Sequence, residues 1–220
     1  MRLLRSINGS LSLALPVLLT VCVCANVLAD SVKTSTNTND NLPEPHRVVQ
    51  DITDRLLFII NDGKLDPITS PDKFYNSAAA ILEPIVAFNY IAKGVMGNYA
   101  DQVTPEQQQR FTKTFKKGLV NTYSKGIAGF SDSISITILQ PEVKTTGQRK
   151  VSVIQKVLNR GTTTYVSYTM AQNRGKQWKL VNVVLNGINL GKTFRGQFAQ
   201  AVQKNQGNVI KVIDEWGKDS

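Results

Sequence analysis

The hydrophobic periodicity of this chain changes near Gly129, and that change constrains the fold more than any other feature of the sequence. Before Gly129 the apolar residues recur every three or four positions, as they do on one face of a helix. After Gly129 the period becomes two, and Ile134, Ile136 and Ile138 alternate with serine and threonine. Helical spacing returns from about Phe194. Helices first, antiparallel strands next and helices last are typical of an α+β domain.

Apolar spacing and capping residues predict about six helices. The clearest start is Thr104-Pro105-Glu106-Gln107, which supplies a threonine N-cap, proline at the first turn and glutamine three residues after the cap. The helix that it opens is expected to run to about Gly126 with Phe111 and Phe115 on its apolar side. The other helices are predicted over residues 46–61, 70–82, 88–96, 194–204 and 208–216.

Alternation predicts a twisted antiparallel sheet of about four strands. Glycine-containing hairpin turns are expected at Asn159-Arg160-Gly161 and at Asn173-Arg174-Gly175, between runs of β-branched residues. The strands are predicted over residues 134–138, 151–157, 166–170 and 178–185.

The first 29 residues have the organisation of a secretory signal. Arg2 and Arg5 form a short positive region, residues 11–23 form an apolar run, and small residues precede Asp30. The apolar run is too short for a stable membrane span, which predicts a cleaved signal peptide over residues 1–29. Export of the protein follows from it.

A lipoprotein signal is the alternative, because Cys22 and Cys24 lie near the expected cut. A lipidation site requires a small residue before its cysteine, and Val21 and Val23 occupy those positions. Both cysteines fall inside the signal, so the mature chain is expected to have no disulfide.

The next segment, residues 30–44, is polar, rich in threonine and asparagine, and without an apolar period. It is predicted to be a disordered leader, followed by one folded domain over residues 45–220. The whole chain has 26 lysines and arginines against 16 acidic residues. Removal of the signal leaves a net charge of +8.

The mature chain offers little catalytic chemistry. Its one histidine, His46, lies at a predicted helix start without a surrounding motif and is expected to be exposed. Asp51 and Asp54 share a helix with no second acidic pair facing them in the sequence. No metal-ligand spacing and no glycine-rich phosphate-binding motif occurs. These observations argue against an enzyme, a metal site and a cofactor.

A basic stripe lies on the long helix, opposite its apolar side, and consists of Arg110, Lys113, Lys117 and Lys125. It is interpreted either as the solvated face of a helix or as a docking surface for an anionic partner. Export makes nucleic acid the poorest partner class for a basic chain of this kind.

Aromatic and methionine side chains are concentrated where the long helix is expected to face the sheet. They include Met96, Tyr99, Tyr123, Tyr168 and Met170. Such residues form either an ordinary core or the lining of a cavity for a hydrophobic ligand. Patterning alone leaves both open and favours the core.

A series of short motifs occurs in a specific order. They are Val95-Met96-Gly97-Asn98-Tyr99, Thr104-Pro105-Glu106-Gln107, Phe111, Phe115, Leu119-Val120-x-x-Tyr123, Trp178-Lys179-Leu180, Asn182-Val183, Gly187-Ile188-x-Leu190 and Phe194-Arg195-x-Gln197-Phe198. With this order and spacing the chain resembles the MlaC family, also called the toluene-tolerance family, over residues 48–216. These are periplasmic phospholipid carriers of Gram-negative bacteria.

The resemblance implies an NTF2-like sheet wrapped by helices, with an apolar cavity between them that takes the acyl chains of a phospholipid. It also implies a periplasmic protein that moves lipid between an outer-membrane lipoprotein–porin complex and an inner-membrane ABC transporter complex, and so maintains outer-membrane lipid asymmetry. Phospholipid is then a transported ligand and no cofactor is required. The family often has acidic residues where this chain has Asn182 and Asn186.

The lipid-lining residues are predicted from the apolar stripe of the helices, the alternation of the strands and the quoted motifs. They are Met96, Tyr99, Phe115, Leu119, Tyr123, Val153, Tyr168, Met170, Val181, Val183, Ile188, Leu190 and Phe198. Two other classes of function stay open, namely an enzyme on the same scaffold that acts on a small hydrophobic substrate and a non-catalytic interaction module with a solid core.

Overall fold

The computed structural model describes residues 42–61, 69–128, 134–141 and 145–217, and the side chains of 121–128 are outside this description. The predicted signal peptide and the first part of the predicted leader, residues 30–41, lie outside the described residues. The end of that leader is folded: Leu42 is buried and the first helix begins at Glu44. The folded part therefore begins before residue 45, because Leu42 contributes to the core.

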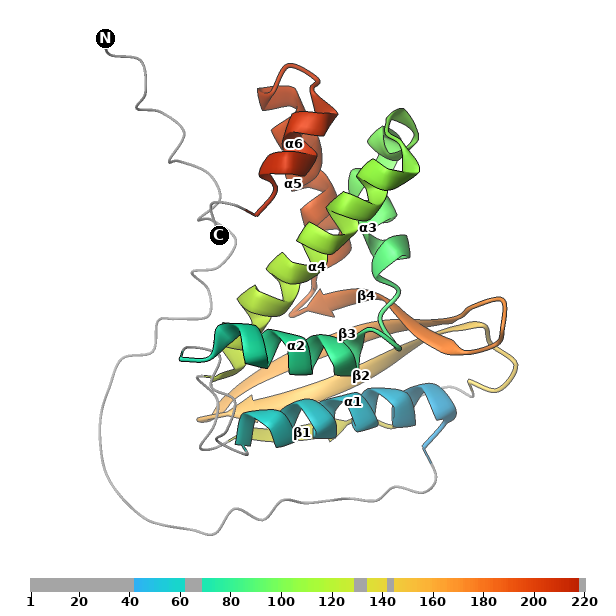
Figure 1. Cartoon of the computed structure of the whole chain (residues 1–220). Coiled ribbons are helices and arrows are strands. Elements are labelled where there is room, and N and C mark those ends of the chain that lie inside the picture. Colours follow the sequence, from blue (N-terminus) through green and yellow to red (C-terminus); the bar gives the residue numbers. More distant parts are fainter. Residues whose placement is uncertain (1–41, 62–68, 129–133, 142–144, 218–220) are drawn as a thin grey trace. The chain divides into compact units, whose positions relative to one another are not determined.

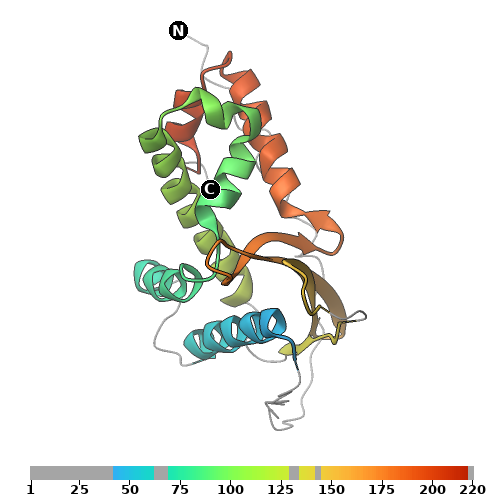
Figure 2. The same cartoon turned by 90° about the vertical axis from the view of Figure 1, so that its right-hand side faces the viewer.

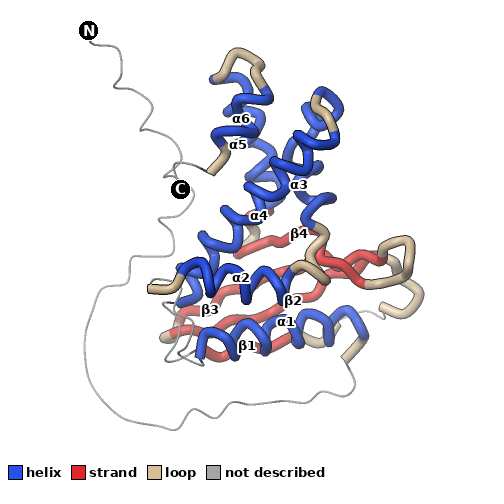
Figure 3. The backbone as a smooth tube through the Cα atoms, viewed as in Figure 1, coloured by secondary structure: helices blue, strands red, loops and turns tan. Residues whose placement is uncertain are grey.

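The described residues form an α+β fold in which helices precede and follow one antiparallel sheet (Figures 1 and 3). The helices are α1 (Glu44–Asn61), α2 (Pro71–Leu82), α3 (Phe88–Met96), a 3₁₀ helix η2 (Gly97–Gln102), α4 (Pro105–Ala128), α5 (Leu190–Lys204) and α6 (Val209–Glu215). The strands are β1 (Ile134–Ile138), β2 (Lys150–Asn159), β3 (Thr162–Gln172), β4 (Trp178–Leu185) and β5 (Ile188–Asn189), in that order across the sheet.

Most predicted elements are confirmed, and the local signals explain why. At the start of α4 the Thr104 backbone N–H donates to Gln107 Oε1 at 2.8 Å, and the Gln107 N–H donates to Thr104 Oγ1 at 3.3 Å. This reciprocal pair satisfies two helix-end donors, as the capping sequence predicted. The β2–β3 hairpin turns at Arg160 and Gly161, both with positive φ, as a two-residue turn requires.

The sheet has five strands, where about four were predicted. Asn186 and Gly187 both have positive φ and form a two-residue turn that pairs Leu185 with Ile188. The Asn186 side chain supports this turn by accepting from the Tyr165 N–H at 2.9 Å. An Asn-Gly pair after an apolar strand is a strong hairpin signal, and the two-residue β5 that it creates was missed. Helix α5 follows β5 directly and begins four residues earlier than predicted.

Asn189 and Asn182 both support the start of α5. The Asn189 side chain is the N-cap and accepts from the Lys192 N–H at 3.0 Å. Asn182 Oδ1 accepts from the Gly191 N–H at 3.3 Å, and a Cβ at Gly191 would lie 2.7 Å from that oxygen. Asn182 therefore has a structural role, and a side chain at position 191 would displace its amide from this hydrogen bond.

The register of the sheet decides which side chains share a face. Val151 is opposite Met170, which is opposite Leu180, and Val153 is opposite Tyr168, which is opposite Val183. Between these rows β4 has a bulge that leaves Val181 unpaired. The face that carries Val151, Val153 and Met170 is called the inner face below. Helices α1 and α2 lie on one side of the sheet, and the sheet curves with α1 inside the curve (Figures 1 and 2).

Three groups of buried residues hold these elements together. The helical cluster joins α3, η2, α4, α5 and α6, and consists of Ala92, Val95, Met96, Ala100, Phe111, Phe115, Phe198, Val202, Val209, Val212 and Ile213. The sheet cluster joins α1 to the inner face, and consists of Leu42, Val49, Ile138, Val151, Val153, Met170 and Trp178. The third, the α2–α4 cluster, has Phe74, Ala78 and Val120 at its centre, with Leu56, Ile59, Ile60, Tyr75 and Leu82 packed around them.

His46 differs from its prediction. It is 1% exposed, and its Nδ1 has no hydrogen-bond partner. It lies in the first turn of α1, where its side chain is buried in the fold. Burial lowers the pKa of His46 below its ordinary value, because desolvation disfavours the charged ring.

This lowered pKa gives the fold an acid sensitivity. The unfolded chain binds a proton at His46 near pH 6.5 and the folded chain only at lower pH. The free energy of unfolding is therefore highest above about pH 6.5 and falls as the pH drops below it. We expect His46→Leu to reduce this dependence in urea unfolding measured at several pH values. An unchanged pH profile in the variant would show that His46 does not contribute to it.

Candidate functional site

The inner face of the sheet changes in burial along its length. At one end Val151, Val153 and Met170 are almost fully covered by the sheet cluster. Toward the other end the apolar side chains are only half-buried although they lie on the same face. This half-buried strip consists of Ile136, Val157, Val166, Val183 and Leu185.

Apolar residues from four helices have the same partial exposure. Leu56 on α1 and Leu82 on α2 belong to the rim of the α2–α4 cluster, and Leu119 on α4 and Phe194 on α5 to the rim of the helical cluster. Apolar surface that packing leaves partly exposed becomes more favourable when a ligand removes it from water. The half-buried strip and these helical residues are suited to a hydrophobic ligand.

A polar group interrupts the apolar inner face at its middle. Gln155 is 3% exposed and lies opposite Ile138 and Val166. Its Oε1 accepts from the Tyr168 hydroxyl at 2.8 Å, and its Nε2 donates to Thr53 Oγ1 on α1 at 2.8 Å. Burial raises the pKa of Tyr168 to about 12, so its hydroxyl keeps the proton that it donates.

The predicted lining residues of the helices lie mainly in a solid core. Met96, Phe115 and Phe198 are at most 1% exposed in the helical cluster, and Tyr99 and Leu119 pack at its edge. The expectation that α4 faces the sheet is corrected by the structure, because α4 packs against α2, α3 and α6. Periodicity identified a buried face of α4 but not the partner that buries it.

Ring contacts show how closely the helical cluster is packed. Phe111 contacts Phe198 edge to face with centroids 5.0 Å apart, Phe115 stacks on Phe111 at 5.7 Å, and Trp216 contacts Phe111 at 5.5 Å. Such pairs add stability beyond burial alone. The side chain of Tyr123, also predicted to line the site, lies outside the described residues.

The predicted lining residues of the strands divide between core and strip. Val153 and Met170 are fully buried in the sheet cluster, Tyr168 packs against that cluster, and Val183 belongs to the half-buried strip. The bulge places Leu180, not Val181, opposite Met170, because the extra residue shifts the alternation.

The last predicted lining residues lie beyond the bulge. Ile188 is 55% exposed at the β4–β5 turn, and Leu190 is half-buried where α5 begins. Ile136, Val157, Val166 and Leu185 were missed, although the same alternation that selected Val153 and Tyr168 includes them.

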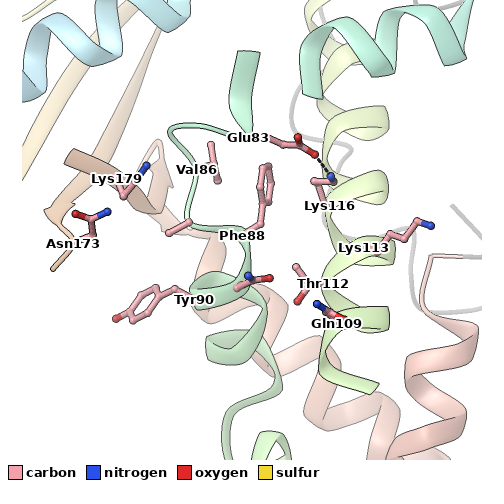
Figure 4. Close-up of a pocket in the computed structure, with 12 residues that line it drawn as sticks. Glu83, Val86, Phe88, Tyr90, Gln109, Thr112, Lys113, Lys116, Asn173 and Lys179 are labelled. Atoms are coloured by element: carbon pink, nitrogen blue, oxygen red, sulfur yellow. Dashed lines mark hydrogen bonds and ion pairs between the residues drawn. The ribbon is translucent and has the colours of Figure 1, made fainter. Parts of the chain in front are cut away.

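A second feature is an open cleft of about 610 Å³ between the α2–α3 connection, α4 and the β3–β4 turn (Figure 4). Phe88 lies at its centre, with the ammonium of Lys116 5.9 Å from the ring centroid. Lys116 also pairs with Glu83, and Lys179 Nζ donates to the Pro84 carbonyl at 2.6 Å. Lys113, which also lines the cleft, has no partner among the described residues. The cleft therefore presents a net positive charge.

The residues of the predicted basic stripe differ in whether an acidic side chain pairs with them. Arg110 Nη2 is 3.1 Å from Asp214 Oδ1 on α6, so its charge is locally balanced. Lys113 and Lys117 are exposed and unpaired in the described part of the chain. The side chain of Lys125 lies outside the described residues.

The described residues contain no group of three or more histidine, cysteine or acidic side chains placed to hold a metal ion. Among the same residues no helix combines the length and the hydropathy that a membrane span needs.

Comparison with known proteins identifies the family. The model of the family described as "MlaC protein" matches residues 50–218. The chain belongs to the MlaC family. It is 38% identical over 174 residues to the toluene tolerance protein ttg2D of Pseudomonas putida. The aligned region covers 78% of this chain and 79% of that protein.

A solved structure has the same fold. The phospholipid-binding protein from Ralstonia solanacearum, in complex with a phospholipid, superposes with a TM-score of 0.69 at 24% identity, over 79% of this chain and 96% of the other. At this identity the likeness establishes the α+β fold. The predicted family resemblance and fold class are thus confirmed.

A charged substitution separates core from ligand lining. We expect Met170→Asp, in the sheet cluster, to lower the free energy of unfolding by more than about 4 kcal/mol, because an unpaired carboxylate would be buried. Ile154→Asp, on the opposite face of the neighbouring strand, should cost about 1 kcal/mol. Urea unfolding of both variants measures the difference. A Met170→Asp protein as stable as the wild type would show that this position faces a ligand space instead of a packed core.

Proposed function

We propose that this MlaC-family protein binds phospholipid through its acyl chains and carries it across the periplasm. The observation that carries the proposal is the half-buried strip on the inner face of the sheet, together with the partly exposed apolar side chains of Leu56, Leu82, Leu119 and Phe194 on the helices. The family membership and the phospholipid found in the Ralstonia solanacearum protein support the same ligand class.

The physical need for such a carrier is large. A phospholipid has about 30 methylene groups, and at about 0.8 kcal/mol each their exposure to water costs on the order of 20 kcal/mol. Passage through an aqueous compartment therefore requires an apolar enclosure. The membrane and the protein site are both apolar, so transfer between them is nearly balanced. Binding and release need no catalytic group.

The proposed route runs between two membranes. The cleaved signal over residues 1–29 delivers the chain to the periplasm, where it exchanges lipid with an inner-membrane ABC transporter complex and an outer-membrane lipoprotein–porin complex. This traffic maintains the lipid asymmetry of the outer membrane. In such a scheme the partner complexes determine the direction of transport.

Organic extraction of the purified, full-length mature protein, followed by mass spectrometry, tests the ligand class. We expect phospholipid at a fixed molar ratio to protein. A small non-lipid metabolite would support an enzyme on this scaffold, and a protein without any extractable ligand would support a solid interaction module. Either of those outcomes would contradict the proposal.

Two adjacent residues of β3 give a matched test of the site. Val166 is half-buried in the strip, whereas Tyr165 is 49% exposed on the opposite face. We expect Val166→Asp to reduce co-purified phospholipid at least about tenfold, because a carboxylate beside acyl chains is costly. Tyr165→Asp should leave the lipid content unchanged. Equal lipid content in the two folded variants would place the acyl chains elsewhere.

The unpaired lysines Lys113 and Lys117 are proposed to dock an acidic surface of the transporter complex. Charges of this kind accelerate encounter more than they tighten binding. We expect Lys113→Glu combined with Lys117→Glu to slow association with the inner-membrane complex and to leave the lipid load intact. Added salt should slow the wild type toward the variant, because screening acts over about 8–10 Å.

Stopped-flow or surface-based association rates at low and high salt measure the effect. The matched control exchanges Lys150 and Lys156 on β2 for glutamate, which changes the net charge equally at another surface. Equal slowing in the control would assign the effect to net charge, and salt-insensitive rates in all proteins would make the lysines an ordinary solvated face.

A further inference from the structure

The hydrogen-bonded group formed by Gln155, Tyr168 and Thr53 is the one polar assembly that the described structure places on the inner face between the sheet cluster and the half-buried strip. A buried primary amide is costly unless both of its ends are paired. Here the two ends are paired from different elements: the Tyr168 hydroxyl on β3 donates to the oxygen, and the nitrogen donates to Thr53 on α1.

The group is also fixed to the backbone. Thr53 Oγ1 donates to the Val49 carbonyl at 2.8 Å, one turn earlier in α1. Gln155 is therefore held between a helix and a sheet by side chains that each have a defined partner. Such a network resists rearrangement, because a rotamer change of Gln155 breaks at least one buried hydrogen bond.

The position of this group coincides with the change in burial. On one side lie Val151, Val153 and Met170, which are at most 5% exposed. On the other side along β2 lies Val157, which is half-buried and opposite Ile136 and Thr164. Gln155 occupies the row between Val153 and Val157, and the half-buried Val166 and Leu185 lie in that same row on β3 and β4.

We propose that Gln155, with Tyr168 and Thr53, forms the closed end of the acyl-chain site and limits the length of acyl chain that the protein accepts. The inference rests on the proposed function and deepens it. An acyl chain that runs along the inner face of β2 from Val157 meets the amide before it reaches Val153 in the sheet cluster. To pass further it must separate paired polar groups and leave them unsatisfied in an apolar surrounding.

A polar end wall has a property that an apolar wall lacks. Apolar side chains, methionine above all, change rotamer at small cost and let a ligand extend into the core. The hydrogen-bonded wall resists this because its side chains have no alternative partners within the cluster. The depth of the site is then set by one residue of the sheet, and chain length becomes a selected property of the cargo.

Competitive loading tests the proposal. The full-length mature protein is incubated with mixed vesicles of dimyristoyl and distearoyl phosphatidylglycerol, and the bound lipids are measured by mass spectrometry. We expect Gln155→Ala to raise the ratio of long to short lipid by about fourfold for each additional methylene that becomes buried. Ile154→Ala, which removes side-chain volume from the opposite face of the same strand, should keep the wild-type ratio.

A measurement on the wild type keeps the test decisive if Gln155→Ala does not fold. A phospholipid with a diazirine at the end of its acyl chain is loaded and photolysed, and the labelled peptides are sequenced. Adducts on Gln155, Tyr168 or Val166 support the proposal, and adducts on Val151 or Met170 overturn it. An unchanged ratio in folded, loaded Gln155→Ala also overturns it, whereas wild-type protein that binds neither lipid contradicts the proposed function itself.

Discussion

Contacts among aromatic rings in the helical cluster are the interaction on which the rest of this structure depends. Phe111, Phe115, Phe198 and Trp216 join α4, α5 and the end of α6 at centroid separations of 5.0 to 5.7 Å. Both cysteines of the chain lie in residues 1–41, so the described fold is held by packing without a disulfide. This cluster contains no strand residue, and the sheet cluster covers only part of the inner face.

Links between the helices and the sheet are short and directional. The segment before α3 pairs with β4, where the Ala87 N–H donates to the Leu180 carbonyl at 3.0 Å and the Leu180 N–H donates to the Ile85 carbonyl at 2.9 Å, and α5 continues from β5 without an intervening loop. Helix α1 is joined to β2 by the hydrogen bond between Gln155 and Thr53. The elements around the proposed lipid site are thus positioned by specific polar contacts, and their apolar side chains remain free to contact a ligand.

Local signals predicted the elements but not their partners. The Thr104 capping sequence, the turn at Arg160-Gly161 and the alternation of β1 and β2 depend on residues close in sequence, so they could be recognised. Burial of Phe115 against other helices instead of the sheet depends on tertiary packing, which a helical period does not encode. The burial of His46 could not be predicted for the same reason, because it also depends on tertiary packing. Of the predicted lining residues, Val183 lies in the half-buried strip, whereas Val153 and Met170 are core.

The bulge in β4 has a consequence for how this sequence tolerates changes in length. Val181 is unpaired, and Leu180 and Val183 on its two sides both lie on the inner face. Loss of one residue elsewhere in a regular strand would move every following side chain to the other face. Deletion of Val181 would instead restore regular alternation and keep Leu180 and Val183 where they are. Related chains that differ by one residue in this strand would therefore retain the same apolar surface, and an alignment that places the gap at any other position of β4 would be structurally incorrect.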